Sequence, residues 1–304
     1  MKFGVHTGLQ ETSFDELIPL WKRIEALGYD WISVWDHIYP TLGASAGPNL
    51  DAIVALSALA SSTERVRIGC LVFNTTLRPP ALLANAGAAI DQLSGGRLEM
   101  GLGAGWNREE QEESGIEFPP DGVRVTMMAE SIEVIRCLWS EETVDFTGRH
   151  FELRDAKCDP KPVQSEVPLW VGAFRPRALE IAGRLGDGFN APYVAPRLWA
   201  SLWRRVGEAA EAAGRDAPTP SVNVGLFPDT DLRRAQARCE ESMGTAAAMG
   251  GHLCGPADAI LEKVAEYRDA GVERLNVVMR PPFDIGAIES FASEIVAQFG
   301  EGDR

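Results

Sequence analysis

The chain has 304 residues, of which 45% are hydrophobic and 24% charged, enough to bury a sizeable core in one large domain or two smaller ones. Its 29 Lys and Arg against 44 Asp and Glu give a net charge of -15, which argues against nucleic acid or an anionic membrane as partner. The five cysteines are scattered, no apolar run reaches about 18 residues and no signal peptide is recognisable, so we expect a reduced, cytoplasmic protein.

Short apolar runs alternate with helical patterns along the chain. The runs expected to form strands are 3–7, 31–35, 66–73, 97–103, 167–173, 188–192, 221–227 and 274–279. The segments expected to form helices are 17–27, 50–61, 79–94, 123–139, 176–185, 196–213, 232–248, 256–270 and a terminal helix. The alternation in 143–153, around Thr147-Gly148, predicts a β-hairpin inserted between the fourth helix and the fifth strand.

Eight strands, each followed by helix, predict a (β/α)8 TIM barrel with insertions. An open doubly wound sheet more often uses fewer strands and has its glycine signature after the first strand, whereas here the glycines follow the fourth. No linker or shift in composition divides the chain, and we expect a single domain over 1–304.

In such a barrel the functional residues lie where strands end. The strand ends carry His6, Thr7, Trp35, Asp36, His37, Val72, Phe73, Asn74, Thr75, Gly103, Ala104, Gly105, Trp106, Asn107, Gly172, Ala173, Phe174, Arg175, Asn190 and Arg280.

His37 directly follows a strand, and histidine is the side chain best suited to proton exchange near neutral pH, so it is the candidate to hold or pass a proton. The alternative is a structural Asp36-His37 pair that caps the loop. His6 is equally well interpreted as a second functional histidine or as a packed one. Gly103 and Gly105 admit the close approach of a flat or phosphorylated ligand, although they also fit a simple strand-to-loop turn.

The segment Gly172 to Arg177 predicts an anion site. Pro176 begins a helix, and the unpaired N–H groups of a first helical turn can bind an anion. Arg175 and Arg177 stand at this end, where the helix macrodipole disfavours positive charge, and a bound phosphate would explain their presence. The alternative is that both arginines are solvated surface charges.

No other catalytic chemistry has a signature. The four histidines show no metal-ligand spacing, and neither a Gly-x-Ser-x-Gly elbow nor a Ser-x-x-Lys motif is present, so we expect no metal and no protein nucleophile. Glu109, Glu110, Glu112 and Glu113 look like one solvated face. An anion site without these groups favours a cofactor that brings its own reactivity.

Several motifs together resemble the luciferase-like flavin and deazaflavin oxidoreductases: FGVHTG, WISVWDH, SGGRLEMGLGAGW and RLGDGFNAP, with a match over roughly 1–280. The loop sequences are most similar to those of members that use the deazaflavin coenzyme F420. The resemblance implies that His37 is catalytic and that the cofactor contacts Asp36, His37, Val72, Phe73, Asn74, Thr75, Gly103, Ala104, Gly105, Trp106, Gly172, Ala173, Phe174 and Arg175. It also implies a bulge at the end of the third strand, where relatives often have a non-prolyl cis peptide.

Two departures accompany the resemblance: Arg78-Pro79-Pro80 stands where relatives have Arg-His-Pro, and Gly172-Ala173-Phe174 is bulkier than the usual glycine-rich loop. The implied activity is F420-dependent hydride transfer between the deazaflavin C5 and a small organic substrate. The alternative is an FMN-dependent two-component monooxygenase using reduced flavin and O2, and a third possibility is a non-catalytic flavin-binding barrel. A flavin or F420 reductase is a possible partner that supplies the cofactor, and a homodimer is expected by resemblance only.

Overall fold

Eight parallel strands close into a barrel in the computed structural model, which describes residues 1–41 and 47–299. Around the barrel the order is β9-β11-β1-β2-β3-β4-β7-β8, and the pairing of β8 with β9 closes it. The strands are β1 (Lys2–Thr7), β2 (Trp31–Val34), β3 (Arg67–Asn74), β4 (Leu98–Gly103), β7 (Leu169–Gly172), β8 (Gly188–Asn190), β9 (Thr219–Pro228) and β11 (Arg274–Met279). The predicted (β/α)8 barrel is confirmed.

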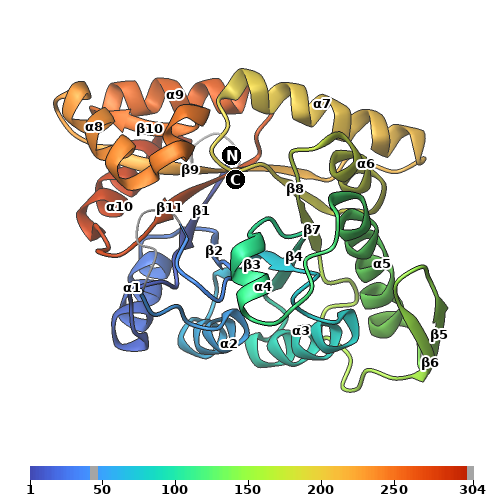
Figure 1. The fold of residues 1–304 in the computed structure, drawn as a ribbon. Coiled ribbons are helices and arrows are strands. Elements are labelled where there is room, and N and C mark those ends of the chain that lie inside the picture. Colours follow the sequence, from blue (N-terminus) through green and yellow to red (C-terminus); the bar gives the residue numbers. More distant parts are fainter. Residues whose placement is uncertain (42–46, 300–304) are drawn as a thin grey trace.

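Helices surround the barrel, most of them on its outer side (Figure 1). They are α1 (Phe14–Ala26), α2 (Ala52–Ser62), α3 (Pro80–Ser94), α4 (Arg108–Glu113), α5 (Asp121–Ser140), α6 (Pro176–Leu185), α7 (Pro196–Ala212), α8 (Leu232–Met243), α9 (Ala257–Asp269), α10 (Ile285–Phe291) and α11 (Ala297–Phe299), with a 3-10 turn at Gly244–Met249 and a π-turn at Ala292–Val296. Within the described ranges, none of these helices has the length and apolar character needed to cross a membrane.

Local sequence sets the helix ends. The Asp51 carboxylate accepts the N–H groups of Ile53 and Val54 and so caps α2. Helix α3 has Pro80 in its first turn, where a missing N–H costs no hydrogen bond, and it ends at Gly95 in the left-handed conformation, with φ 67°.

Three elements depart from the simple alternation. The antiparallel hairpin of β5 (Val144–Thr147) and β6 (Glu152–Ala156) lies outside α5, as predicted (Figure 1). The sequence did not predict β10 (His252–Gly255), which pairs with the end of β9 beyond the closed barrel. It also did not predict α4, which Figure 1 shows over the ends of β3 and β4.

The end of the barrel where the strands start is filled by an ionic and aromatic cluster. The Arg274 guanidinium lies 4.6 Å from the Trp31 ring centroid and 4.7 Å from that of Trp170. It forms an ion pair with Glu99, which also pairs with Arg67. Burial raises the pKa of Glu99, but the two guanidinium groups outweigh it and hold the pKa below its ordinary value. Depressions of about 320 Å³ and 800 Å³ at this end contain none of the predicted site residues, so the candidate site lies at the other end.

Candidate active site at the strand ends

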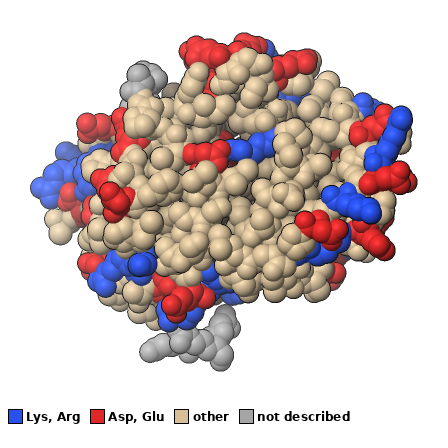
Figure 2. Space-filling view, turned by 90° about the horizontal axis from the view of Figure 1, so that it is seen from below, with Lys and Arg blue, Asp and Glu red and all other residues tan. Residues whose placement is uncertain are grey.

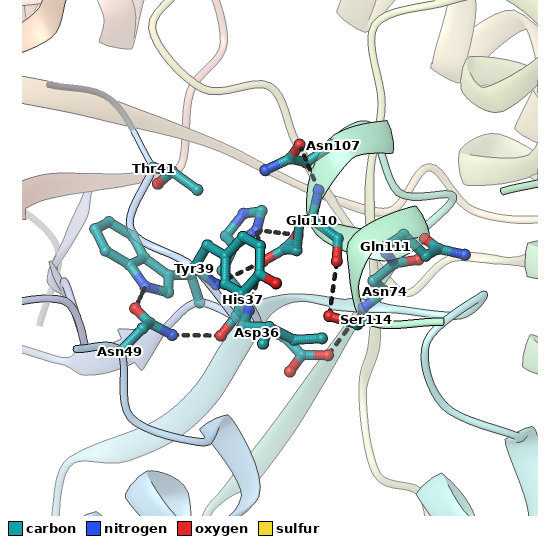
Figure 3. Close-up of polar contacts among 12 residues, drawn as sticks. Asp36, His37, Tyr39, Thr41, Asn49, Asn74, Asn107, Glu110, Gln111 and Ser114 are labelled. Carbon is teal, nitrogen blue, oxygen red and sulfur yellow. Dashed lines mark hydrogen bonds and ion pairs between the residues drawn. The ribbon is translucent and has the colours of Figure 1, made fainter. Parts of the chain in front are cut away.

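The short helix α4 ties together the ends of β2, β3 and β4. Its cap is Asn107, whose side chain accepts the Glu110 N–H. The carboxylate of Glu110 accepts hydrogen bonds from the N–H groups of Ile38 and Tyr39, in the loop after β2. The neighbouring Gln111 side chain accepts a 3.3 Å hydrogen bond from Asn74 at the end of β3. Two adjacent residues of α4 therefore hold two strand ends (Figure 3).

Glu110 corrects the interpretation of the acidic run as one solvated face. Glu110 is only 1% exposed, whereas Glu109, Glu112 and Glu113 are exposed. Burial raises the pKa of Glu110, but hydrogen bonds from His37 and from the backbone of residues 38 and 39 outweigh it, and the net pKa lies below the ordinary value. Glu110 is thus a buried carboxylate paired with the predicted catalytic histidine.

The Glu110 carboxylate determines which ring nitrogen of His37 carries a hydrogen. Its Nδ1 lies 3.0 Å from one Glu110 carboxylate oxygen and 3.2 Å from the other. A carboxylate only accepts, so Nδ1–H donates and Nε2 is the ring nitrogen left for a further partner. Within the described chain Nε2 has no protein hydrogen-bond partner, and the side chain is 16% exposed. The Asn49 side-chain amide donates to the His37 carbonyl and fixes the backbone (Figure 3).

Asp36 is structural in its contacts. Its buried carboxylate accepts the Asn74 N–H at 3.2 Å and pairs with Arg78, whose Nη2 lies 2.8 Å away. Arg78 also reaches Asp51, at 2.7 Å. Asp36 therefore joins the ends of β2 and β3 through an arginine that precedes the Pro79-Pro80 pair.

The end of β3 bulges, and glycines in β4 and β7 make room for it. The Leu71–Val72 peptide is cis, and the register against β4 shifts between Cys70 and Phe73. A Cβ on Gly103 would lie 2.4 Å from Val72 Cγ2, and one on Gly172 would lie 3.0 Å from Val72 Cγ1. These glycines therefore have a packing reason of their own: only a bare backbone admits Val72 between the strands.

The remaining predicted residues divide into two groups. Phe73, Asn74, Thr75 and Ala173 are buried, with the Thr75 hydroxyl donating to the Gly103 carbonyl at 3.1 Å. The other group comprises the accessible side chains Trp106, Phe174 and Arg175, together with the partly exposed Ala104 and Gly105. A Cβ on Gly105, at φ 74°, would lie 2.6 Å from Asn74 Oδ1, so this glycine is also required by packing.

Exposed aromatic rings lie at the barrel mouth. Trp106 is 63% exposed and its ring centroid is 5.6 Å from that of His37. Phe174 is 40% exposed. Arg177, which the sequence placed at an anion site, instead bonds the Gly122 carbonyl at 3.1 Å and the Thr126 hydroxyl at 2.8 Å. That part of the prediction is replaced by a structural contact between α6 and α5.

His6 is a packed histidine. It is 3% exposed, its Nδ1 lies 2.8 Å from the Ser33 hydroxyl, and its ring meets that of Trp35 edge-on at 5.8 Å. Burial first, then the nearby charges of Arg280 and His37, lower the pKa of His6 to about 3. Its ring stays neutral at ordinary pH, so of the two interpretations of His6 the packed one is favoured.

No metal centre is visible in the described ranges 1–41 and 47–299: no group of three or more His, Cys, Asp or Glu side chains is placed to hold an ion. All five cysteines are free thiols. Sequence reasoning missed two residues of the candidate site, Glu110 and Tyr193, the latter considered below. A local signal existed only for Glu110, in the Asn107 cap that predicts a helix.

A closed parallel barrel with an ordered set of polar groups at its strand ends defines a (β/α)8-barrel enzyme of the kind that binds its reactants in the mouth. The profile of the luciferase-like monooxygenase family matches residues 1–249. The chain therefore belongs to the luciferase-like monooxygenase family, as the sequence motifs indicated.

Relatives within this family differ in activity. The chain is 36% identical over 240 residues to the F420-dependent glucose-6-phosphate dehydrogenase of Amycolatopsis mediterranei, covering 77% of this chain and 72% of that protein. It is 30% identical over 206 residues to the pyrimidine monooxygenase RutA of Cronobacter sakazakii, covering 65% and 56% respectively. An F420-dependent secondary alcohol dehydrogenase, solved with an F420-acetone adduct, has the same fold, with a TM-score of 0.86, 23% identity and coverage of 97% and 98%.

Proposed function

We propose that this protein is an F420-dependent oxidoreductase that transfers a hydride between the deazaflavin C5 and a small organic substrate. The observation that carries the proposal is the His37–Glu110 pair beside the exposed Trp106 ring at the barrel mouth. The 36% identity to an F420-dependent dehydrogenase supports the deazaflavin over a flavin.

The residues present fit a flat ring system with a phosphorylated tail. Trp106 and Phe174 offer exposed aromatic surface, which is costly in water and favourable against a ring. Arg175 is exposed at the start of α6, and within the described chain its guanidinium has no hydrogen bond or ion pair. We therefore retain the predicted cofactor contacts, with Trp106, Phe174 and Arg175 as the side chains that reach it.

The protein groups would do the proton work. When bound, F420 supplies a carbon centre that gives or takes a hydride. His37 holds or moves the proton at Nε2, because Glu110 fixes the other nitrogen as a donor. The Glu110 carboxylate also stabilises the positive charge that His37 acquires on protonation. Neither a metal nor a protein nucleophile is needed in this scheme.

The second candidate is an FMN-dependent two-component monooxygenase, which the 30% identity to RutA favours. Such an enzyme needs a reductase partner to supply reduced flavin. A non-catalytic flavin-binding barrel is the third, and the intact His37–Glu110 pair argues against it.

The deciding experiment is a parallel titration of the purified protein with F420 and with FMN, followed by cofactor fluorescence. We expect saturable F420 binding and little binding of FMN, and then turnover with secondary alcohols or enones. A preference for FMN, with oxygen consumption in the presence of a reductase, would favour the monooxygenase. Binding without turnover of any acceptor would favour the non-catalytic barrel.

The assembly that we propose is a homodimer through α2 and α3. Figure 2 shows, on the face below these helices in Figure 1, a broad area free of charged side chains. Helix α2 has no ionisable residue, and the only one in α3, Asp91, is buried. Val54, Leu82 and Leu93 are each more than half exposed on the two helices, which a monomer rarely leaves uncovered. Light scattering gives the mass, and a monomer at micromolar concentration would contradict the proposal.

We also propose that residues 1–304 act as one domain in the cytoplasm. The scattered free thiols support a reducing compartment. Limited proteolysis checks the first point, because a stable fragment shorter than the barrel would reveal a second domain.

A further inference from the structure

Arg280, the residue after β11, lies on the same wall of the barrel mouth as His37. Its guanidinium carbon is 5.7 Å from the Trp35 ring centroid. The same Trp35 ring is 6.5 Å, centroid to centroid, from that of His37 and 5.8 Å from that of His6. One tryptophan therefore separates a fixed positive charge from the histidine that exchanges a proton.

Within ranges 1–41 and 47–299, no ion pair neutralises the charge on Arg280. Among the described residues no carboxylate lies within ion-pair distance of it, although the chain has 44 acidic residues against 29 basic ones. Its Nη groups make two long hydrogen bonds, 3.2 Å to the Tyr193 hydroxyl and 3.4 Å to the Ser242 carbonyl. Its Nε–H is buried and has no hydrogen-bond acceptor in the part of the chain that the structure describes. By contrast, Arg78 pairs with two carboxylates, those of Asp36 and Asp51.

Tyr193, the partner of Arg280, is held in a conformation that side chains rarely adopt. Its φ is 64°, in the left-handed region. The backbone there is fixed at both ends, because Tyr193 N–H donates to the Asn223 carbonyl at 2.7 Å and the Gly251 N–H donates to the Tyr193 carbonyl at 2.8 Å. Gly251 has no room for a side chain against this backbone. A left-handed tyrosine held so firmly is typical of a functional site.

The groups around Arg280 leave its charge intact. The Tyr193 ring stacks on His252 at 5.6 Å. The two ring nitrogens of His252 are used by the Ala246 carbonyl and the Gly225 N–H. Burial lowers the pKa of His252, which stays neutral and adds no competing charge. The nearby Asp284 carboxylate lies 3.5 Å from Arg238.

We propose that Arg280 and Tyr193 form a subsite that binds the acidic group of the substrate, a carboxylate or a phosphate, across Trp35 from His37. The inference rests on the proposed function in placing the reacting carbon near His37. A guanidinium binds either anion through two parallel N–H groups, and the tyrosine hydroxyl adds a third donor. The substrate class that follows is a small acid bearing an oxidisable or reducible carbon. Among the secondary alcohols and enones proposed above, the subsite selects those that carry a carboxylate or a phosphate.

The test uses phenylacetate, phenyl phosphate and the neutral phenylacetamide as probes, with ligand-observed NMR giving the dissociation constants. Each probe is titrated into the cofactor-free protein and into the F420-loaded protein. We expect at least one anion to bind about tenfold more tightly than the amide, the gain from one charge-assisted hydrogen bond. Arg280→Gln is expected to remove this difference, and Arg280→Lys to restore part of it.

Matched controls separate the possible failures. Arg205→Gln, at an exposed arginine of α7, is expected to bind every probe as the wild type does. Equal binding of anions and amide, or an unchanged preference in Arg280→Gln, would overturn the subsite. A parallel loss of F420 affinity in Arg280→Gln would assign the arginine to the cofactor instead. If the wild type binds no F420, the proposed function fails, while the cofactor-free titrations still decide on Arg280.

Discussion

Replacing Glu110 by glutamine tests the buried carboxylate at the centre of the site. The side chain keeps its size, but an amide offers one acceptor oxygen to three donors, the Nδ1–H of His37 and the N–H groups of Ile38 and Tyr39. Losing one or two hydrogen bonds to a charged acceptor, at ~1.5 to 3 kcal/mol each, lowers the unfolding free energy at neutral pH by ~1.5 to 6 kcal/mol. Urea unfolding followed by tryptophan fluorescence measures this loss.

The pH dependence gives a second readout with a definite sign. The pKa of Glu110 is lowered by folding, so its stabilisation is present above the ordinary carboxyl value and is lost as the pH falls through the lowered folded value. The difference in unfolding free energy between the wild type and Glu110→Gln therefore becomes smaller as the pH is lowered. The control is Glu112→Gln on the same helix, whose exposed pair with Arg108 contributes at most ~0.5 kcal/mol. If both variants lose the same free energy, or if the difference is constant with pH, the reasoning on Glu110 is wrong.

Four further outcomes are expected. Gly103→Ala forces a methyl group against Val72 and lowers the unfolding free energy by ~1 to 3 kcal/mol, measured by urea titration; an unchanged midpoint would remove the packing reason for this glycine. Arg175→Ala weakens the phosphorylated cofactor far more than its dephosphorylated analogue in a fluorescence titration, and equal weakening would take Arg175 out of the phosphate site. His37→Ala lowers kcat with an unchanged circular dichroism spectrum, and full activity would return His37 to a structural role. Leu82→Glu places a charge on the apolar face of α3 and shifts light scattering towards a monomer, whereas an unaltered mass would show that this face is not the interface.

The barrel was predictable because its strands are buried on both faces and read as continuous apolar runs between helical patterns. Strand β10 was not, because its four residues, His252–Gly255, carry no alternation and pair only with the overhanging end of β9. The hairpin was found because its two strands alternate around Thr147-Gly148. Local sequence patterns thus determine the elements that form the barrel, whereas the extra strand forms only because the end of β9 offers it a partner.

The position of the site was predictable from the sequence, but the contacts between its residues were not. The strand-end rule found His37 and Arg280 from the sequence. Four glutamates in the six residues of α4 predict a solvent-exposed helix. Only the contact with the loop after β2 determines that Glu110 is the buried one. Nothing in the sequence around Tyr193 indicates a left-handed backbone, since glycine or asparagine is the usual residue there.

The double attachment of α4 limits the changes in loop length that this chain can tolerate. Glu110 and Gln111 are adjacent in the chain, so inserting or deleting one residue between Gly105 and Glu110 would displace both partners at once. A change in the length of this loop is therefore expected to destabilise the β2 to β4 side of the barrel. Substitution is better tolerated in the loops after β8 and β11, which carry Tyr193 and Arg280, because it leaves the His37–Glu110 pair in place.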